Sequence, residues 1–136
     1  MKVVLDTNVL VAAMIARGVC ADLFERVIAD HELILSPHIL GEFEYVMTSK
    51  FKFNKARIER SLALFRRVGQ IVIPEPLAEP VCRDRDDDSV LALAQKSSAD
   101  CLVTGDDDLL ILGEFHRIPI ISPRAFLTFE VHHDHD

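Results

Sequence analysis

Lys2-Val3-Val4-Leu5-Asp6-Thr7-Asn8 is a short apolar run that ends at a carboxylate. The apolar residues of this run do not alternate with polar ones, which is typical of a strand buried on both faces of a sheet. Residues 9–15 are then continuously apolar, and we interpret them as a helix. Asp6 therefore lies where a buried strand ends and a helix begins, at the edge where open α/β sheets bind ligands.

The composition predicts one globular domain. The chain has 136 residues, of which 49% are hydrophobic, so it can bury a proper core. Its net charge of −7 argues against a simple phosphate-binding module, because nucleic-acid binders are usually basic. An enzyme whose acids hold cations remains compatible with this charge. We expect a domain over residues 1–130 and a flexible tail over residues 131–136.

The sequence also predicts the compartment. We see no signal peptide, and no apolar run approaches the roughly 20 residues of a membrane span, so no membrane contact is expected. The three cysteines, Cys20, Cys82 and Cys101, show no CxxC spacing. Reduced cysteines in a cytoplasmic protein fit this pattern best.

Strand-like runs alternate with helical periodicity along the chain. Strands are predicted at residues 3–5, 32–35, 70–73, 101–104 and 118–121. Ser36-Pro37 and Asn54 are typical helix starts, and a short last helix is expected to end at Phe126. The alternation predicts an α/β fold, a three-layer α/β/α sandwich with a central parallel sheet.

Acidic residues recur at one edge of this predicted sheet. Asp6 and Asp106 follow the ends of central strands, and Asp87 precedes the helix that leads into the fourth strand. Glu42 lies three residues after Ile39, so it flanks the buried stripe of its helix. Any one of these acids alone is more simply interpreted as a helix cap or a solvated side chain.

Together the four acids predict a metal site. Two carboxylates about 5 Å apart repel by roughly 3 kcal/mol at an effective dielectric near 20, which is large against a domain stability of about 5–15 kcal/mol. Such a cluster needs shared protons or a bound cation. Ligands that are all oxygen select Mg²⁺ or Mn²⁺, and no His or Cys stands at these positions to favour zinc.

Four blocks of the sequence carry a family resemblance. They are Val4 to Leu10, Glu42, Asp84-Arg85-Asp86-Asp87-Asp88, and Val103 to Leu110. In this order and spacing they resemble the PIN-domain ribonucleases over nearly the whole chain, and most closely the single-domain, VapC-like toxins of toxin–antitoxin pairs. The resemblance implies a PIN-like sandwich, an Mg²⁺ or Mn²⁺ site, an RNA substrate, an antitoxin partner and a homodimer.

The resemblance also implies roles for individual residues. It assigns catalysis and metal binding to Asp6, Glu42, Asp87 and Asp106, with Asp108 as a further metal ligand. Asn8 and Thr104 match polar positions that support the ligands. Asp86 or Asp88 can replace Asp87 in this assignment, because the choice rests on spacing along the helix.

Residues 50–67 reverse the charge of this acidic chain. The RNA-binding candidates are Lys50, Lys52, Lys55 and Arg57, and Phe51 and Phe53 between them can stack on bases. The alternative is a solvated helix face whose two phenylalanines belong to the core or to a partner interface.

We therefore predict a metal-dependent endoribonuclease, the toxin of a toxin–antitoxin pair. Three alternatives remain open: a structure-specific DNA nuclease with the same acids, a receiver-type signalling domain that binds Mg²⁺, and a non-enzymatic RNA-binding module whose acids only cap helices. The signalling domain needs a Lys near the last strand, where residues 115–123 offer only Arg117. Titration with a divalent metal ion distinguishes the non-enzymatic RNA-binding module, whose acids only cap helices, from the metal-dependent nucleases.

Overall fold

The computed structural model describes residues 1–135, with side chains up to His132. Within this range the strands form one six-stranded sheet in the order β3-β2-β1-β4-β6-β5. The strands are β1 Lys2–Leu5, β2 Glu32–Leu35, β3 Gly69–Ile71, β4 Cys101–Val103, β5 Glu114–Phe115 and β6 Ile118–Ile121. Neighbouring strands are parallel except for β5, which pairs antiparallel with β6.

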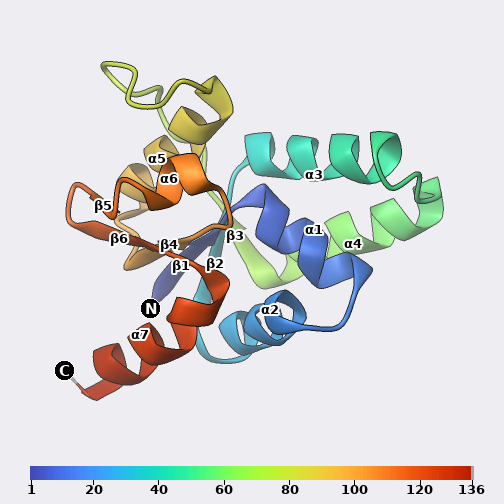
Figure 1. The fold of residues 1–136 in the computed structure, drawn as a ribbon. Coiled ribbons are helices and arrows are strands. Elements are labelled where there is room, and N and C mark those ends of the chain that lie inside the picture. The colour runs from blue at the N-terminus through green and yellow to red at the C-terminus, as the bar shows by residue number, and fades with distance from the viewer. Residues whose placement is uncertain (136) are drawn as a thin grey trace.

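Helices cover both faces of the sheet, so the predicted α/β/α sandwich is confirmed (Figure 1). They are α1 Thr7–Ile15, α2 Val19–Asp30, α3 Pro37–Ser49, α4 Lys55–Val68, α5 Arg85–Ser97, α6 Asp107–Leu110 and α7 Pro123–His135. Figure 1 shows α1 to α4 on one side of the strands and α5 and α6 on the other. Among the described residues no single helix has the length and composition of a membrane span; α1 and α2 have them only as a pair, bent by 106°.

The two central strands are β1 and β4. Val4 of β1 pairs with Ile34 of β2 on one side and with Leu102 of β4 on the other. The chain therefore leaves β1 toward one edge of the sheet and leaves β4 toward the other edge. Between strands whose connections diverge in this way, a crevice opens at their carboxyl ends.

Packing in the hydrophobic core fixes the position of α3, the helix that carries Glu42. The apolar residues of β1 are fully buried, as predicted for a strand covered on both faces. Phe43 of α3 packs edge-to-face on Phe65 of α4 at 4.8 Å between ring centres, and Phe65 packs on Phe24 of α2 at 5.7 Å. Because Phe43 is fully buried next to Glu42, the orientation of α3 fixes where that carboxylate lies.

Two elements at the carboxyl-terminal end differ from the predictions. The strand β5 was not predicted; its turn to β6 places His116 and Arg117 at φ 49° and 68°, a conformation that sequence rules reserve for Asn and Gly. The helix α7 continues well beyond Phe126, because the buried carboxylate of Glu130 is bonded by Arg26 of α2 and by His31.

Smaller differences concern element ends and the tail. The third strand ends at Ile71, although the amide of Val72 still donates to the carbonyl of Leu35 at 2.8 Å. Of the predicted flexible tail, residues up to His135 belong to α7 and residue 136 lies outside the described residues. The flexibility of residues 131–136 stays a prediction.

Candidate metal centre

An open cleft of about 440 Å³ lies at the carboxyl ends of β1 and β4. The side chains of the four acids that the sequence singled out all line it: Asp6, Glu42, Asp87 and Asp106. Its other polar lining residues are Thr7, Asn8, Lys50, Asp84 and Asp86. Segments far apart in the sequence thus bring their carboxylates together at the predicted edge of the sheet.

Asp6 is held at the bottom of this cleft by both flanking elements. Its amide donates to the carbonyl of Val103 at 3.0 Å, which continues the β1–β4 pairing by one residue. Its carboxylate accepts hydrogen bonds from the Thr7 amide at 2.7 Å and the Thr104 hydroxyl at 2.8 Å. Burial raises the pKa of Asp6, and the hydrogen bonds from Thr104 and Thr7 oppose that rise.

Thr104 connects two of the acids directly. Its fully buried hydroxyl donates to Asp6 and accepts from the amide of Asp106 at 3.0 Å. Asn8 makes a parallel connection, since its side chain lies 3.5 Å from the Asp6 carboxylate and accepts from the amide of Gly105 at 3.3 Å. The two polar residues predicted to support the ligands therefore contact Asp6 and join it to the turn after β4.

Replacing Thr104 by Val is expected to weaken divalent-cation binding by about 10–100-fold, the usual effect of losing a residue that orients a ligand. The same change is expected to lower the free energy of unfolding by about 2 kcal/mol, because the Asp106 amide loses its acceptor. Isothermal titration with Mn²⁺ and urea unfolding measure the two effects. Thr48→Val, on the exposed side of α3, is the matched control. Wild-type Mn²⁺ affinity in the Thr104 variant would contradict the role of this hydroxyl.

Glu42 enters the cleft from the side of α3. Its Oε1 accepts a hydrogen bond from the Thr7 hydroxyl at 3.0 Å, and the Nε2 of His38 lies 3.5 Å from the same oxygen. Burial is the largest contribution to the raised pKa of Glu42, and the Thr7 hydrogen bond partly offsets it. Thr7 thus links Glu42 to Asp6, because its hydroxyl donates to Glu42 and its amide donates to Asp6. The sequence analysis did not identify this role.

The acidic side chains in the first turn of α5 contact different neighbours. Asp87 is buried and lines the cleft, whereas Asp86 is more exposed and lies 3.0 Å from the Nε2 of His38. The carboxylate of Asp88 accepts from the amides of Val81 and Cys82 and so holds the preceding loop against α5. Of the two alternatives to Asp87, only Asp86 lines the cleft.

Asp87 is the acid whose charge is most disfavoured. Burial, followed by a hydrogen bond and charge repulsion from Asp106, raises the pKa of Asp87 to about 7. Asp84, the N-cap of α5, adds repulsion and also lines the cleft. Asp84 was not predicted as a site residue, although an acid three positions before Asp87 is a recognisable helix start.

Two of the four predicted catalytic acids, which line the cleft, also cap helices. Asp6 and Asp106 are the N-caps of α1 and α6, as the simpler interpretation predicted. The capping bond to Asp106 comes from the amide of Asp108 and uses Oδ1 at 2.9 Å. The side chain of Asp108 is exposed and pairs with Arg83 at 3.1 Å, so it stands at the margin of the site.

The donor set fits a hard divalent cation. Carboxylate oxygens of Asp87, Asp106 and Asp108 lie within 4.8 Å of one another and form a group of oxygen ligands only. A second group of the same extent contains Glu42, Asp86 and an imidazole nitrogen of His38, which the sequence analysis did not expect, and Asp6 belongs to neither group. Among the described residues no Lys or Arg forms an ion pair with the four predicted catalytic acids. Asp6, Glu42 and Asp87 have raised pKa values and no Lys or Arg partner in the described part of the chain, as expected of carboxylates whose compensating positive charge is to come from a metal.

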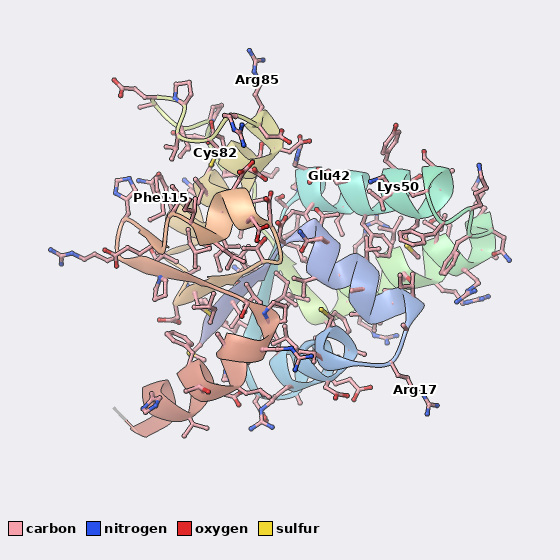
Figure 2. The ribbon with its side chains drawn as sticks, in the orientation of Figure 1. Arg17, Glu42, Lys50, Cys82, Arg85 and Phe115 are labelled. Carbon is pink, nitrogen blue, oxygen red and sulfur yellow. The ribbon has the colours of Figure 1, made fainter. Side chains whose placement is uncertain are left out.

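The predicted RNA-binding residues are not all placed alike. Lys50, which lies at the end of α3 (Figure 2), lines the cleft together with Phe51, which is 43% exposed. The Arg57 guanidinium lies 4.1 Å above the ring of Phe53, so this ring face is covered. Lys52, in the loop between α3 and α4, and Lys55, the first residue of α4, are exposed and do not line the cleft.

Comparison with known proteins supports the family resemblance. A family model described as a PIN domain matches residues 2–108. An uncharacterized protein of Methanocaldococcus jannaschii is 37% identical over 143 residues, which cover 93% of this chain and 89% of the relative.

Solved structures share the fold. A chain of the VapBC2 complex of Rickettsia felis, bound to a promoter DNA fragment, superposes with a TM-score of 0.63 at 18% identity, covering 90% of this chain and 98% of that one. VapC20 of Mycobacterium tuberculosis, a Sarcin-Ricin loop cleaving toxin, reaches 0.62 at 15% identity, with 86% and 98% covered. Since the PIN-domain match spans residues 2–108 of 136, the protein belongs to the PIN-domain family.

Proposed function

We propose that the protein is an Mg²⁺- or Mn²⁺-dependent endoribonuclease that hydrolyses RNA phosphodiester bonds. The observation that carries this proposal is the convergence of Asp6, Glu42, Asp87 and Asp106 on one cleft between β1 and β4. Membership of the PIN-domain family supports a nuclease role for these acids. Ligands composed only of oxygen favour Mg²⁺ or Mn²⁺ over zinc.

The side chains have distinct tasks in this proposal. Asp6, Glu42, Asp87 and Asp106 hold the metal, with Asp108 as a further ligand at the margin. A divalent ion in such a site polarises a phosphate oxygen and lowers the pKa of a bound water. Thr104 and Asn8 keep the Asp6 carboxylate oriented, and Thr7 does the same for Glu42. The protein thereby provides a preorganised site whose charges need no rearrangement during the reaction.

Basic and aromatic residues at the cleft favour a single-stranded substrate. Lys50 supplies a positive charge beside the acids, and the exposed ring of Phe51 can stack on a base. Lys52, Lys55 and Arg57 extend this positive charge along the chain and are proposed to contact phosphates. A structure-specific DNA nuclease with the same acids is the second candidate function, and DNA is therefore a necessary arm of the experiment.

We further propose that the protein is the toxin of a toxin–antitoxin pair and forms a homodimer. The supporting observation is its similarity in fold to chains of VapBC complexes from Rickettsia felis and nontypeable Haemophilus influenzae.

The three cysteines are free thiols, and burial raises the pKa of Cys101 to about 12. Thiols of this kind suit the reducing cytoplasm, which is the proposed compartment.

The test is a cleavage assay on end-labelled single-stranded RNA with Mg²⁺, Mn²⁺ or EDTA. We expect cleavage with either ion and none with EDTA, and products with 5′-phosphate and 3′-hydroxyl ends, because a water attacks phosphorus in this chemistry. DNA of the same sequence is the parallel substrate. Cleavage that persists in EDTA, or products with cyclic phosphates, would contradict the proposal, and cleavage of DNA alone would favour the second candidate.

A further inference from the structure

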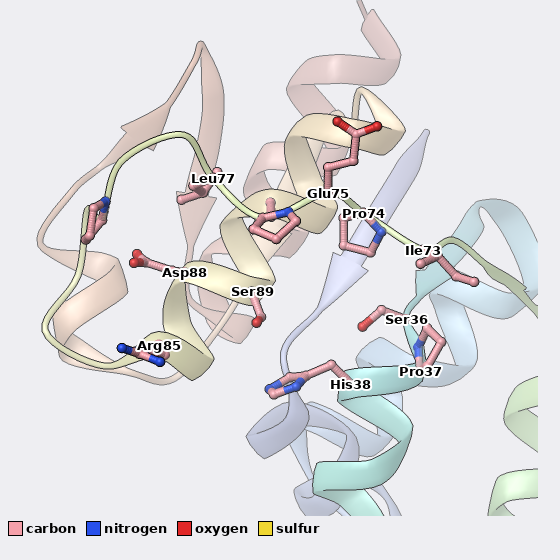
Figure 3. A pocket seen from close by; sticks show the side chains of 13 residues that line it. Ser36, Pro37, His38, Ile73, Pro74, Glu75, Leu77, Arg85, Asp88 and Ser89 are labelled. Atoms are coloured by element: carbon pink, nitrogen blue, oxygen red, sulfur yellow. The ribbon is translucent and has the colours of Figure 1, made fainter.

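A second pocket of about 510 Å³ adjoins the acidic cleft. It lies between the start of α3, the start of α5 and the loop of residues 72–84 that joins β3 to α5 (Figure 3). Neither Asp108 nor any of the four predicted catalytic acids lines it. Neither its loop nor its apolar residues had a role in the function proposed above.

The two hollows share the helices that form their walls. The first turn of α5 directs Asp86 and Asp87 to the acidic cleft, while Arg85 and Ser89 line the second pocket. On α3 the same division separates Glu42 from His38. Because the Nε2 of His38 lies 3.0 Å from Asp86, this contact marks the boundary between the two hollows.

The walls of the pocket combine apolar surface with polar side chains for which the structure shows no hydrogen bond or ion pair among the described residues. Ile73, Pro74, Pro76 and Leu77 give one apolar side, and Ile73 is 75% exposed there. The prolines restrict the backbone of this loop, which lowers the conformational entropy that binding a ligand would cost. Among the described residues no ion pair or hydrogen bond occupies the guanidinium of Arg85 or the hydroxyl of Ser89, whereas Asp88 is engaged by the loop amides.

We propose that this pocket holds one unstacked base of the RNA substrate, next to the phosphate that is cut in the acidic cleft. The inference rests on the proposed function and assigns it a specificity site. A planar base suits the apolar wall, while the Ser89 hydroxyl offers a hydrogen-bond partner to its edge (Figure 3). Arg85 also lines the pocket, and its side chain points outward, away from Glu42 (Figure 2), so its guanidinium can contact a phosphate at the outer rim of the pocket. A pocket of this volume accommodates one nucleotide.

The test uses nucleoside 5′-monophosphates of the four bases and ribose 5-phosphate as a probe without a base. Each is titrated into the ¹⁵N-labelled protein with and without Mg²⁺, and the amides of Ile73, Leu77, Ser89 and Ala92 are followed by NMR. We expect saturable shifts at these amides with at least one nucleotide in both conditions. Ribose 5-phosphate is expected to leave the amides of Ile73 and Leu77 unmoved, since it lacks the base that contacts them.

Two variants and two matched controls sharpen this experiment. Ile73→Ala is expected to weaken nucleotide binding about tenfold by removing apolar contact, and Arg85→Gln about tenfold by removing a charged donor. Ile111→Ala and Arg17→Gln change equally exposed residues that line neither hollow and should bind like the wild type. In cleavage of an RNA library, Ile73→Ala should also flatten the preference for one base near the cut.

The outcomes separate this inference from the function on which it rests. If RNA is cleaved but no nucleotide shifts the pocket amides, the base site is wrong and the nuclease proposal stands. If nucleotides shift these amides but RNA is not cleaved, the base site stands and the nuclease proposal fails. Equal shifts with ribose 5-phosphate at Ile73 and Leu77 would overturn the base site, because they would show binding of the sugar phosphate alone.

Discussion

Asp6→Asn is expected to reduce the rate of RNA cleavage about a thousandfold, which corresponds to about 4 kcal/mol of lost transition-state stabilisation. Among the acids whose side chains the structure describes, only Asp6 receives hydrogen bonds from both central turns, through Thr7 and Thr104. An amide keeps the size of the side chain but removes the charge that a divalent cation needs. Because burial raises the pKa of Asp6, a neutral side chain costs the fold little at this position.

Single-turnover cleavage of a labelled RNA measures this effect, and circular dichroism checks that the variant is folded. Asp30→Asn, an exposed change at the end of α2, is the matched control and should cleave like the wild type. Cleavage by Asp6→Asn within about tenfold of the wild-type rate would remove the metal site from the mechanism, since tenfold is only about 1.4 kcal/mol.

Without a divalent ion, the protein is expected to lose stability as the pH rises from about 4 to about 7. The pKa of Asp87 is about 7 in the folded protein against 3.8 for an ordinary Asp. Between these values the folded state holds a proton that the unfolded state has released, so raising the pH favours unfolding. From this group alone the loss amounts to at most about 4 kcal/mol. Asp87→Asn is expected to remove this part of the pH dependence and to make the metal-free protein more stable at pH 8.

Urea unfolding in EDTA at pH 5 and pH 8 measures the loss, and the same series with Mn²⁺ shows whether the ion restores stability at pH 8. We expect restoration in the wild type, since a ligand that binds only the folded state stabilises it. Asp22→Asn, an exposed acid in the first turn of α2, is the control for a change of one charge near a helix start. A metal-free wild type that is more stable at pH 8 than at pH 5 would show that Asp87 is ionised without cost.

Strong local signals explain which elements were predicted correctly. The runs of β1 and β2 are apolar without alternation, and the helix starts at Ser36 and Asn54 carry recognised caps. The antiparallel strand β5 is only two residues long and has no such signal. The length of α7 depends on the contact of Glu130 with Arg26 and His31, which are distant in the sequence.

The same distinction applies to the site. Asp6 and Asp106 were predictable because each follows a buried strand, and parallel strands end at the same edge of a sheet. Asp86, Asp87 and Asp88 are equivalent by residue type and differ only in the direction that α5 gives them. The covering of Phe53 by Arg57, and the position of Lys50 in the cleft, likewise depend on how α3 meets α4.

The amino-acid sequence by itself determined the α/β architecture, the family resemblance and the acids that share one edge of the sheet, because hydrophobic periodicity and residue type act locally along the chain. Only the tertiary structure decided that Thr7 and Thr104 join acids from separate segments, that Asp88 holds a loop, and that a second pocket adjoins the cleft. These features arise from contacts between residues far apart in sequence, whose distances are set by the packing of the whole core and not by any local pattern.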